Sequence, residues 1–313
     1  MPPAIFVRGL RKSFGDNLVL DGIDFTVPTG TIYALLGPNG AGKTTTVQIL
    51  STLINADGGE ARVAGHDVAA DPDAVRAAIG VTGQFSAVDD LLTGRENLML
   101  MGRLHHLGRR ESTRRAASLL DRFELTDAAT RTPATYSGGM RRRLDLAMGL
   151  VGDPRIVFLD EPTTGLDPRS RRAMWDSIRA MVDDGVTVFL TTQYLEEADE
   201  LADHIALLDG GRFVAEGTAR ELKQLVPGGH IRLRFADAER LRAAEGVFHH
   251  AQTDAAELSL QVPGDTGVAS LRSILDQLDA ASIDVEELSV HTPDLDDVFL
   301  ALTGHDTTRE VAR

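Results

Sequence analysis

A glycine-rich segment, Gly37 to Thr45 (GPNGAGKTT), brings together the residue types that bind phosphate. Its glycines let backbone N–H groups approach phosphate oxygens, where a side chain would block the approach. Lys43 can hold the β- and γ-phosphates of a nucleotide, and the Thr44 hydroxyl is a ligand for Mg²⁺. The fixed positions match the phosphate-loop pattern G-x-x-x-x-G-K-[ST]. The predicted phosphate contacts are Gly37, Pro38, Asn39, Gly40, Ala41, Gly42, Lys43, Thr44 and Thr45.

The segments on either side of this loop fit the same prediction. Residues 32–36 form a short apolar run that is typical of a buried strand, and residues 45–50 can open a helix. Such a helix directs the positive end of its dipole toward a bound anion. Strand, loop and helix together therefore predict a site for nucleotide phosphates.

Two adjacent carboxylates, Asp160 and Glu161, follow a second apolar run at residues 156–159. A carboxylate at the end of a buried strand can hold the coordination sphere of Mg²⁺ opposite Thr44. Glu161 is the candidate general base for an attacking water, and such a base typically contributes ~10²–10⁴-fold in rate. The alternative is an acidic strand end that arose by chance.

A second glycine turn, Ser137-Gly138-Gly139, precedes a predicted helix from about Arg141 to Leu150. A hydroxyl, two glycines and a helix N-terminus make a seat for an anion, as in the first loop. Considered by itself the signal is weak, because Ser-Gly-Gly is also a common loop. The arginines at 141–143 could add positive charge there, although solvation at the surface explains them equally well.

Three single residues are further candidates. Gln84 and Gln193 each follow a predicted strand, on the edge where open parallel sheets bind ligands. A glutamine there can orient water or contact a metal, but a lone glutamine is more often structural. Phe14 lies in a loop, where it could stack on a nucleotide base or fill a hydrophobic gap, and its position does not decide between them.

The elements that would position these residues alternate between strand and helix. After short strand-like runs at 4–7, 18–20 and 23–27, separated by Gly9, Gly15 and Gly22, the pattern predicts antiparallel strands leading into the phosphate-loop strand. Further on, strands and helices alternate to about residue 225, which predicts an α/β fold with a largely parallel sheet covered on both faces. Helical periodicity and a capping box at Thr93 and Glu96 predict an inserted helical subdomain over about 86–150. We expect residues 226–313 to form a small α+β domain without a catalytic constellation of its own.

Composition restricts the function classes. The 313 residues carry a net charge of −15, which argues against nucleic acid as the main partner. The chain has no cysteine, so it has no disulfide framework, thiol nucleophile or cysteine zinc site, and its nine histidines show no zinc-type cluster. No apolar run approaches the roughly 18–20 residues that cross a bilayer, and we expect no signal peptide. If the protein works at a membrane, another chain must supply the membrane part.

The order of these motifs resembles that of the ATPase subunits of ABC transporters. The segments that carry the resemblance are GPNGAGKTT, Gln84, YSGGM (136–140), IVFLDEP (156–162) and TGLDP (164–168). More narrowly, the chain is similar to the daunorubicin/doxorubicin-resistance ATPases. The segments that carry this narrower likeness are VTGQFSAVDDLLTGRENL, TTQYLEEADELAD and LDDVFLALTG (295–304).

The resemblance implies a fold, a set of roles and partners. The fold would be a P-loop NTPase of the ABC type over residues 1–225, with ATP and Mg²⁺ as cofactors. Phe14 would stack on adenine, and Gln84 would contact Mg²⁺ together with Thr44 and Asp160. The remaining implied roles concern a head-to-tail dimer around two ATP molecules, in which Ser137, Gly138 and Gly139 bind the γ-phosphate held by the second copy and Asp167 joins the two sites.

By the same resemblance, the protein is an ATP hydrolase whose cycle drives a separate membrane permease, exporting a hydrophobic drug or antibiotic. It would lie at the cytoplasmic face of the membrane through that permease and be soluble by itself. The alternative is a soluble ABC-type ATPase acting on DNA or ribosomes; a single cassette, the absence of a heptad insertion and the acidic charge argue against it. A GTP-dependent switch lacks the Asn-Lys-x-Asp motif that reads the base.

Two positions depart from the common ABC pattern. The signature is YSGGM rather than LSGGQ, and Gln193 stands where most members have histidine, although glutamine is typical of the narrower subfamily. Glutamine can hydrogen-bond a γ-phosphate but does not titrate near neutral pH. We therefore expect Glu161 to be the base, with Gln193 and Lys43 assisting catalysis. The contacts that select the individual cargo would lie in the permease.

Overall fold

The computed structural model describes residues 2–83, 87–226, 229–264, 267–291 and 293–304. Within it the chain divides into two compact units, Met1–Ala219 and Arg220–Arg313. The first unit contains every motif discussed above except LDDVFLALTG (295–304), which lies in the second unit. Gln84 lies outside the described residues, as do the first residue of the expected helical subdomain, Ser86, and part of the expected domain boundary.

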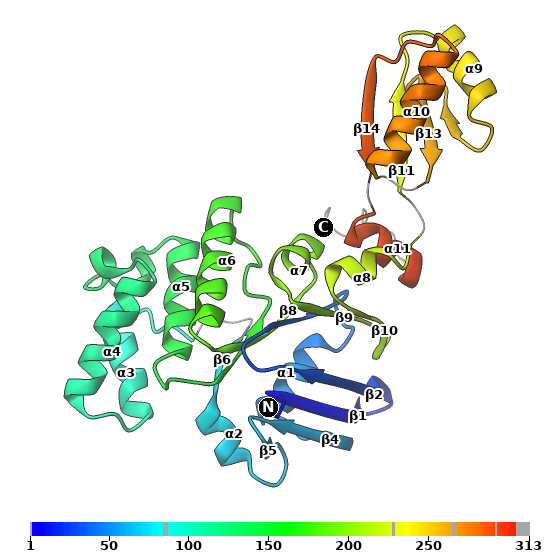
Figure 1. The fold of residues 1–313 in the computed structure, drawn as a ribbon. Helices are drawn as coiled ribbons and strands as arrows, with labels where there is room; N and C mark the ends of the chain where they lie inside the picture. Colours follow the sequence, from blue (N-terminus) through cyan, green and yellow to red (C-terminus); the bar gives the residue numbers. More distant parts are fainter. Residues whose placement is uncertain (1, 84–86, 227–228, 265–266, 292, 305–313) are drawn as a thin grey trace. The chain divides into compact units, whose positions relative to one another are not determined.

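A six-stranded sheet forms the centre of the first unit (Figure 1). Five of its strands run parallel and the edge strand β10 is antiparallel to its neighbour, so the prediction of a largely parallel sheet is confirmed. In spatial order the strands are β10 (Arg212–Gly217), β9 (His204–Asp209), β3 (Ile32–Leu36), β8 (Thr187–Thr192), β7 (Ile156–Asp160) and β6 (Ile79–Thr82). The carboxyl ends of β3, β8 and β7 are consecutive along one edge, and this is the edge on which open parallel sheets bind ligands.

A second, antiparallel sheet consists of β2 (Asn17–Val27), β1 (Ile5–Phe14), β4 (Gly58–Val63) and β5 (His66–Asp67). The three strand-like runs expected at its start form only two strands, because Gly9 and Gly22 lie inside strands rather than between them. Both glycines have positive φ, 59° and 78°, and the pairing of β1 with β2 shifts register beside them. Only Gly15 occupies the turn that was expected of it, between Phe14 and Asn17.

Helix α1 (Lys43–Leu50) lies between the two sheets and belongs to one continuous core with them (Figure 1). Its buried Val47, Ile49 and Leu50 pack with the aliphatic residues of the antiparallel sheet and with Phe158 and Phe189 of the parallel one. Helix α2 (Pro72–Ala78) leads into β6. Helices α6 (Pro168–Asp183) and α7 (Leu195–Leu201) also contact the parallel sheet, on β8 and β3. The phosphate-loop helix therefore has a rigid support on both sides.

The inserted segment is helical, as predicted. It contains α3 (Gly94–Leu104), α4 (Arg109–Arg122), two short 3₁₀ turns (Thr126–Ala128 and Pro133–Thr135) and α5 (Gly138–Gly149). The capping box at Thr93 and Glu96 is present. Helix α5 begins three residues earlier than the expected start at about Arg141, so Gly138 and Gly139 are its first two residues.

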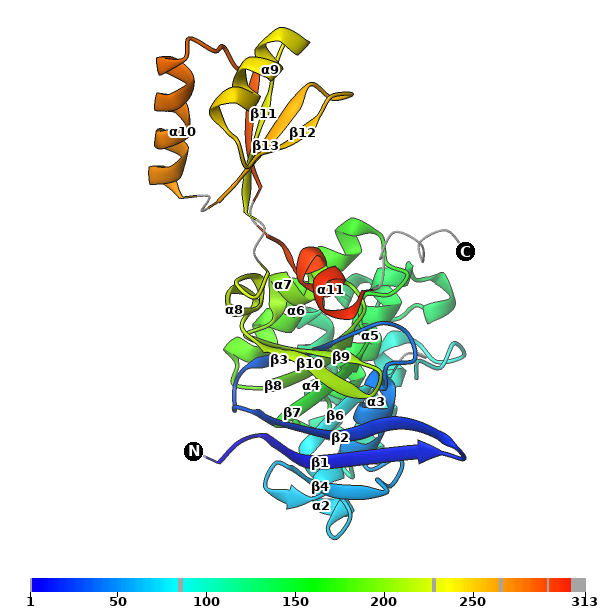
Figure 2. The ribbon, with the colours of Figure 1, turned by 90° about the vertical axis from the view of Figure 1, so that its right-hand side faces the viewer.

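The second unit is α+β. Its four-stranded antiparallel sheet has the order β12 (Gln252–Asp254), β13 (Ser259–Pro263), β11 (His230–Arg234), β14 (Glu287–His291). Helices α9 (Ala238–Val247) and α10 (Val268–Ala280) pack on this sheet through Leu241, Ala244, Ile274 and Leu278 (Figure 2). The remaining helices are α8 (Ala219–Lys223), at the junction in sequence, and α11 (Leu295–Thr303).

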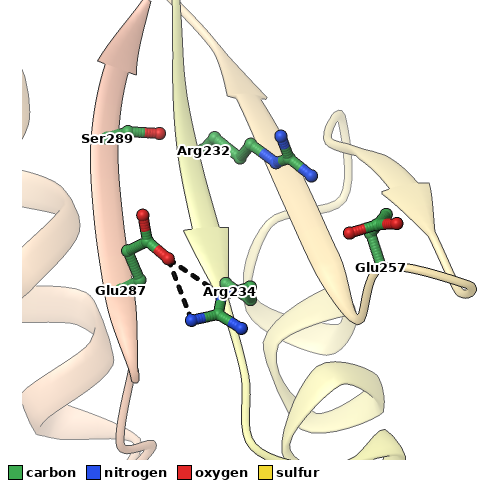
Figure 3. Close-up of a pocket in the computed structure, with 5 residues that line it drawn as sticks. All are labelled: Arg232, Arg234, Glu257, Glu287 and Ser289. Carbon is green, nitrogen blue, oxygen red and sulfur yellow. Dashed lines mark hydrogen bonds and ion pairs between the residues drawn. The ribbon is translucent and has the colours of Figure 1, made fainter.

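The sheet of the second unit also carries a polar hollow of about 270 Å³, lined by Arg232, Arg234, Glu257, Glu287 and Ser289 (Figure 3). Arg234 pairs with Glu287 at 2.9 Å, and Arg232 donates a 3.3 Å hydrogen bond to Ser259. The Arg234–Glu287 pair is a cross-strand pair on an exposed part of the sheet, whereas Ser259 is buried.

Candidate active site

The glycine loop follows β3 and has the backbone shape that its glycines allow. A Cβ on Gly37 would lie 2.2 Å from the backbone oxygen of Leu208, so only glycine fits there. Gly42 has φ 110°, a conformation that L side chains rarely adopt, and it is the N-cap of α1. The N-terminus of α1 thus begins directly after the loop, as the anion-site prediction requires.

Lys43 is 4% exposed and its ammonium group turns back over the loop. Nζ donates to the backbone oxygens of Gly37 (2.7 Å) and Pro38 (3.0 Å), and it lies 3.4 Å from Oε1 of Glu161. A buried ammonium group needs such partners, because burial without them would cost about 5 kcal/mol. The structure therefore brings the loop lysine and the candidate base into direct contact.

Asp160 ends β7, is 3% exposed, and faces the loop from across β8. Its Oδ1 accepts hydrogen bonds from Thr44 Oγ1 (3.2 Å) and from Thr191 Oγ1 (2.5 Å). Thr191 is a contact that the sequence analysis missed. Its only signal was a pair of threonines at the end of an otherwise apolar strand. Thr44 and Asp160, two of the three predicted metal ligands, are thus adjacent.

The donor set at this point suits Mg²⁺. A carboxylate oxygen and a hydroxyl oxygen are hard ligands, and Mg²⁺ is usually bound by one or two such groups together with water and substrate phosphates. Among the described residues no cluster of three or more His, Cys, Asp or Glu side chains could form an all-protein cage. The side chains fit a cation that is completed by phosphate oxygens.

Glu161 adopts a left-handed backbone conformation with φ 49°, which is uncommon outside glycine. Its N–H is held by the backbone oxygen of Thr191 (3.1 Å), and Oε2 accepts a hydrogen bond from Thr164 Oγ1 (3.3 Å). Residues held in this region cost about 1–3 kcal/mol and cluster at functional sites. The strained turn directs the carboxylate toward the loop lysine instead of along the strand.

The second glycine turn is presented outward. Ser137 is the N-cap of α5, and its Oγ accepts a 3.2 Å hydrogen bond from the N–H of Met140. Ser137 and Gly138 are exposed, whereas Gly139 is buried against α6, where a Cβ would lie 2.5 Å from Ser170 Oγ. An exposed serine, a glycine and a helix N-terminus remain available to a ligand that comes from outside this chain.

Asp167 is the N-cap of α6, and the same Ser170 links it to the second turn. The carboxylate accepts hydrogen bonds from Ser170 Oγ (2.6 Å) and from the N–H groups of Arg169 and Ser170 (both 3.0 Å). The hydroxyl of Ser170, and then its N–H, lower the pKa of Asp167 below its usual value. Ser170, which the sequence analysis did not single out, therefore contacts both Asp167 and the position of Gly139.

Phe14 and Gln193 each lie at the end of a strand and differ in exposure. Phe14 ends β1 and is 51% exposed, with Lys12 Nζ 5.3 Å from its ring centre; this exposure does not fit a hydrophobic plug. Gln193 is half-buried and comes directly after β8, beside Thr192, whose hydroxyl accepts from the N–H of Tyr194. Gln84 lies outside the described residues.

The three arginines of α5 do not share one environment. Arg141 pairs with Asp90, and Arg143 pairs with the exposed Glu124 at 2.8 Å. Arg142, by contrast, is only 12% exposed and hydrogen-bonds backbone oxygens around Glu161. The two roles considered for Arg142 from the sequence, positive charge at the anion site of the second glycine turn and solvation at the surface, therefore both fail to describe it. The only hint in the sequence was Asp145, a charged residue one helical turn further on.

Comparisons with known proteins agree with this geometry. The sequence model of the ABC transporter family matches residues 20–164, and that of the C-terminal domain of DrrA1-3-like ATP-binding proteins matches residues 217–303. A solved structure described as the ATP-binding subunit of an ABC transporter is 28% identical, with a TM-score of 0.64 over 71% of this chain and 92% of that chain.

Curated relatives match nearly the whole chain. A daunorubicin/doxorubicin resistance ATP-binding protein of Streptomyces peucetius is 52% identical over 96% of this chain and 93% of its own length. A doxorubicin resistance ATP-binding protein of Mycobacterium tuberculosis is 46% identical over 97% of this chain and 95% of its own. A Nod factor export ATP-binding protein of Sinorhizobium fredii is 36% identical over 97% of this chain and 87% of its own length. Within the described ranges, no helix has the length and apolar character needed to cross a membrane.

Proposed function

Because this chain belongs to the ATP-binding subunits of ABC transporters, we propose that two copies of it hydrolyse ATP·Mg²⁺ to drive export through a separate membrane permease. The observation that carries the proposal is the convergence of Lys43, Thr44, Asp160 and Glu161 at one edge of the parallel sheet. These four side chains come from two segments more than 100 residues apart, and together they are the parts that phosphoryl transfer requires.

Each side chain then has a defined task. The loop N–H groups and Lys43 bind the β- and γ-phosphates, and the Thr44 hydroxyl and the Asp160 carboxylate hold Mg²⁺. When bound, the cation supplies positive charge against the phosphate oxygens. Glu161 accepts the proton of the water whose oxygen attacks the γ-phosphorus. Gln193, which directly follows β8, offers an amide to the γ-phosphate, and Gln84 is proposed as a further metal contact.

A second copy completes the site. Ser137 and Gly138 are exposed at the start of α5, so they can donate to a γ-phosphate that is bound in the loop of a partner copy. Asp167 accepts a hydrogen bond from Ser170, which packs against Gly139, and this contact supports the proposal that Asp167 joins the two sites. Phe14 offers its exposed ring to the adenine.

The cargo class rests on the relatives. The names of the Streptomyces and Mycobacterium proteins refer to daunorubicin and doxorubicin resistance, and that of the Sinorhizobium protein to Nod factor export. We propose a hydrophobic drug or antibiotic as cargo, with the subunit held at the cytoplasmic face by its permease. These names do not favour a soluble ABC-type ATPase that acts on DNA or ribosomes.

The test compares nucleotide binding and phosphate release in the wild type and in Lys43→Ala. Loss of a hydrogen bond to a charged group costs about 1.5–3 kcal/mol, so ATP affinity should fall by at least about tenfold and phosphate release should stop. Lys223→Ala, in the second unit, is the matched control and should behave as wild type. Co-expression with candidate multi-span permeases should recruit the wild-type chain to membranes. Equal ATP affinity in Lys43→Ala would contradict the proposed site.

A further inference from the structure

Helix α5 carries a buried ion pair in its second turn, just behind the serine-glycine turn at its start. Arg142 is 12% exposed and Asp145 is 4% exposed, and Arg142 Nη1 lies 3.2 Å from Asp145 Oδ2. Burial lowers the pKa of Arg142 and raises that of Asp145, while the charge of each partner opposes the shift of the other. Removing one partner of such a buried pair is strongly destabilising, so the segments that the pair contacts are held firmly in place.

The guanidinium group holds the end of β7 through its backbone. Nε donates to the oxygen of Pro162 (2.9 Å), and Nη2 donates to the oxygens of Asp160 (3.1 Å) and Glu161 (3.3 Å). Three consecutive carbonyl groups are thus bound by one side chain. They belong to the strained turn that directs the Glu161 carboxylate toward Lys43.

The same pair also holds the chain on both sides of residues 84–86. Arg142 Nη1 donates to the backbone oxygen of Gly83 (2.8 Å), and the N–H of Ala87 donates to Asp145 Oδ1 (3.0 Å). With the bond to Asp145, the five N–H groups of the guanidinium have five acceptors. A lysine, with three donors on one nitrogen, cannot replace this planar fork.

We propose that Arg142 and Asp145 are a positioning pair that fixes the Glu161 turn and the backbone of Gly83 and Ala87 to helix α5. Helix α5 begins with the serine-glycine turn that meets the partner's ATP, and through Arg142 the same helix holds the Glu161 turn. The position of the base therefore depends on the position of α5. This inference rests on the proposed function and adds to it two residues that touch neither nucleotide nor metal. The pair acts through the backbone, so its effect falls on the rate of the chemical step rather than on nucleotide binding.

The experiment compares the full-length wild type with Arg142→Lys, Asp145→Asn and the double variant. The control is Arg143→Lys, because Arg143 lies next in the same helix and pairs with the exposed Glu124. The readouts are kcat for phosphate release, the Kd for a non-hydrolysable ATP analogue with Mg²⁺, and the thermal midpoint.

We expect Arg142→Lys to lose about 10²-fold in kcat, as a displaced catalytic group does, with Kd unchanged. In Asp145→Asn the asparagine has one acceptor oxygen for two donors, the N–H of Ala87 and Nη1 of Arg142. Its loss in kcat should be smaller than that of Arg142→Lys. The double variant should be no worse than Arg142→Lys, because both changes break the same linkage. Arg143→Lys should match the wild type.

Three results would overturn the inference. One is a wild-type kcat in Arg142→Lys; another is a loss of analogue binding in parallel with kcat; the third is independent, multiplicative losses in the double variant. The activity of the wild type distinguishes a failure of this inference from a failure of the proposed function. A wild-type chain that binds but never cleaves ATP removes both, whereas an active wild type with an unaffected Arg142→Lys removes the inference alone.

Discussion

Nζ of Lys43 lies 3.4 Å from Oε1 of Glu161, and both side chains are almost fully buried. The loop lysine and the candidate base therefore neutralise each other in this structure. ATP phosphates would compete with Glu161 for the lysine, and in taking it they would release the carboxylate to accept a proton from water. Because of this pairing, the binding of phosphate to Lys43 also frees Glu161 to act as the base.

This exchange predicts that Glu161→Gln binds ATP·Mg²⁺ more tightly than the wild type. The glutamine removes both a competitor for Lys43 and a negative charge beside the phosphates. An effect of roughly 1–2 kcal/mol corresponds to about 5- to 30-fold in Kd, which calorimetry can measure. Glu196→Gln is the control, because Glu196 is exposed and pairs with Arg171 on α6. Weaker binding in Glu161→Gln would contradict the competition.

The two glycines of the second turn should respond differently to alanine. In Gly139→Ala the new Cβ would lie 2.5 Å from Ser170 Oγ and 2.8 Å from Ser170 Cβ, and such overpacking costs about 1–3 kcal/mol. In Gly138→Ala the nearest atom is 3.9 Å away, so the fold should be as stable as wild type or slightly more so.

Function should nevertheless suffer in Gly138→Ala, because its methyl group occupies the exposed seat that we assign to the partner's phosphate. Urea unfolding and phosphate release, measured on both variants, check the contrast. Normal hydrolysis in a well-folded Gly138→Ala would argue against the seat.

Residue 193 should leave no trace in the pH–rate profile of the wild type, because glutamine does not titrate. Gln193→His should add an ionisation near the ordinary histidine pKa of about 6.5. Phosphate release measured across the neutral range compares the two profiles. Identical profiles, or full activity in Glu161→Gln, would count against Glu161 as the base.

Stability should depend on pH through Glu197, a fully buried residue of α7. Its Oε1 accepts from Thr163 Oγ1 (2.8 Å) and Trp175 Nε1 (3.1 Å), and burial raises its pKa above the ordinary value of 4.5. The folded state therefore holds the proton more tightly than the unfolded state. Protonation stabilises the fold as pH falls through the raised pKa, and the gain is complete below 4.5.

The measurable quantity is the free energy of unfolding of the wild type minus that of Glu197→Gln, from urea titrations between about pH 8 and pH 5. This difference should increase as pH falls, because the glutamine cannot take up a proton. Glu196→Gln, which changes the exposed neighbour, is the control. A flat difference, or one that decreases toward pH 5, would contradict the assignment.

Much of the fold could be predicted because its signals are local. The phosphate loop, the run before Asp160 and the capping box at Thr93 each specify their own structure within a few residues. The glycines at 9 and 22 were misassigned as separators because a bulge and a turn use the same residue type, and only the partner strand distinguishes them.

The contacts that complete the site could not be predicted for the opposite reason. Thr191 lies 31 residues from Asp160, Ser170 lies 31 residues from Gly139, and Arg142 lies 59 residues from Gly83 and 18 to 20 residues from the three carbonyl groups of residues 160–162. Each is an ordinary residue in its own segment. Arg142 resembles its neighbours 141 and 143 in sequence, and only the helix phase turns it inward. Their roles are visible only once the helical insertion and the parallel sheet are packed together.

The account depends most on two copies closing around ATP, and the oligomeric state of Glu161→Gln tests this directly. The variant should retain ATP because the base is lost while Lys43, Thr44 and Asp160 remain. Light scattering after size-exclusion chromatography in saturating ATP·Mg²⁺ is predicted to show a dimer that carries two nucleotides, and adding Gly138→Ala should return it to a monomer. A Glu161→Gln chain that stays monomeric and empty of nucleotide, both by itself and with its permease, would contradict the account.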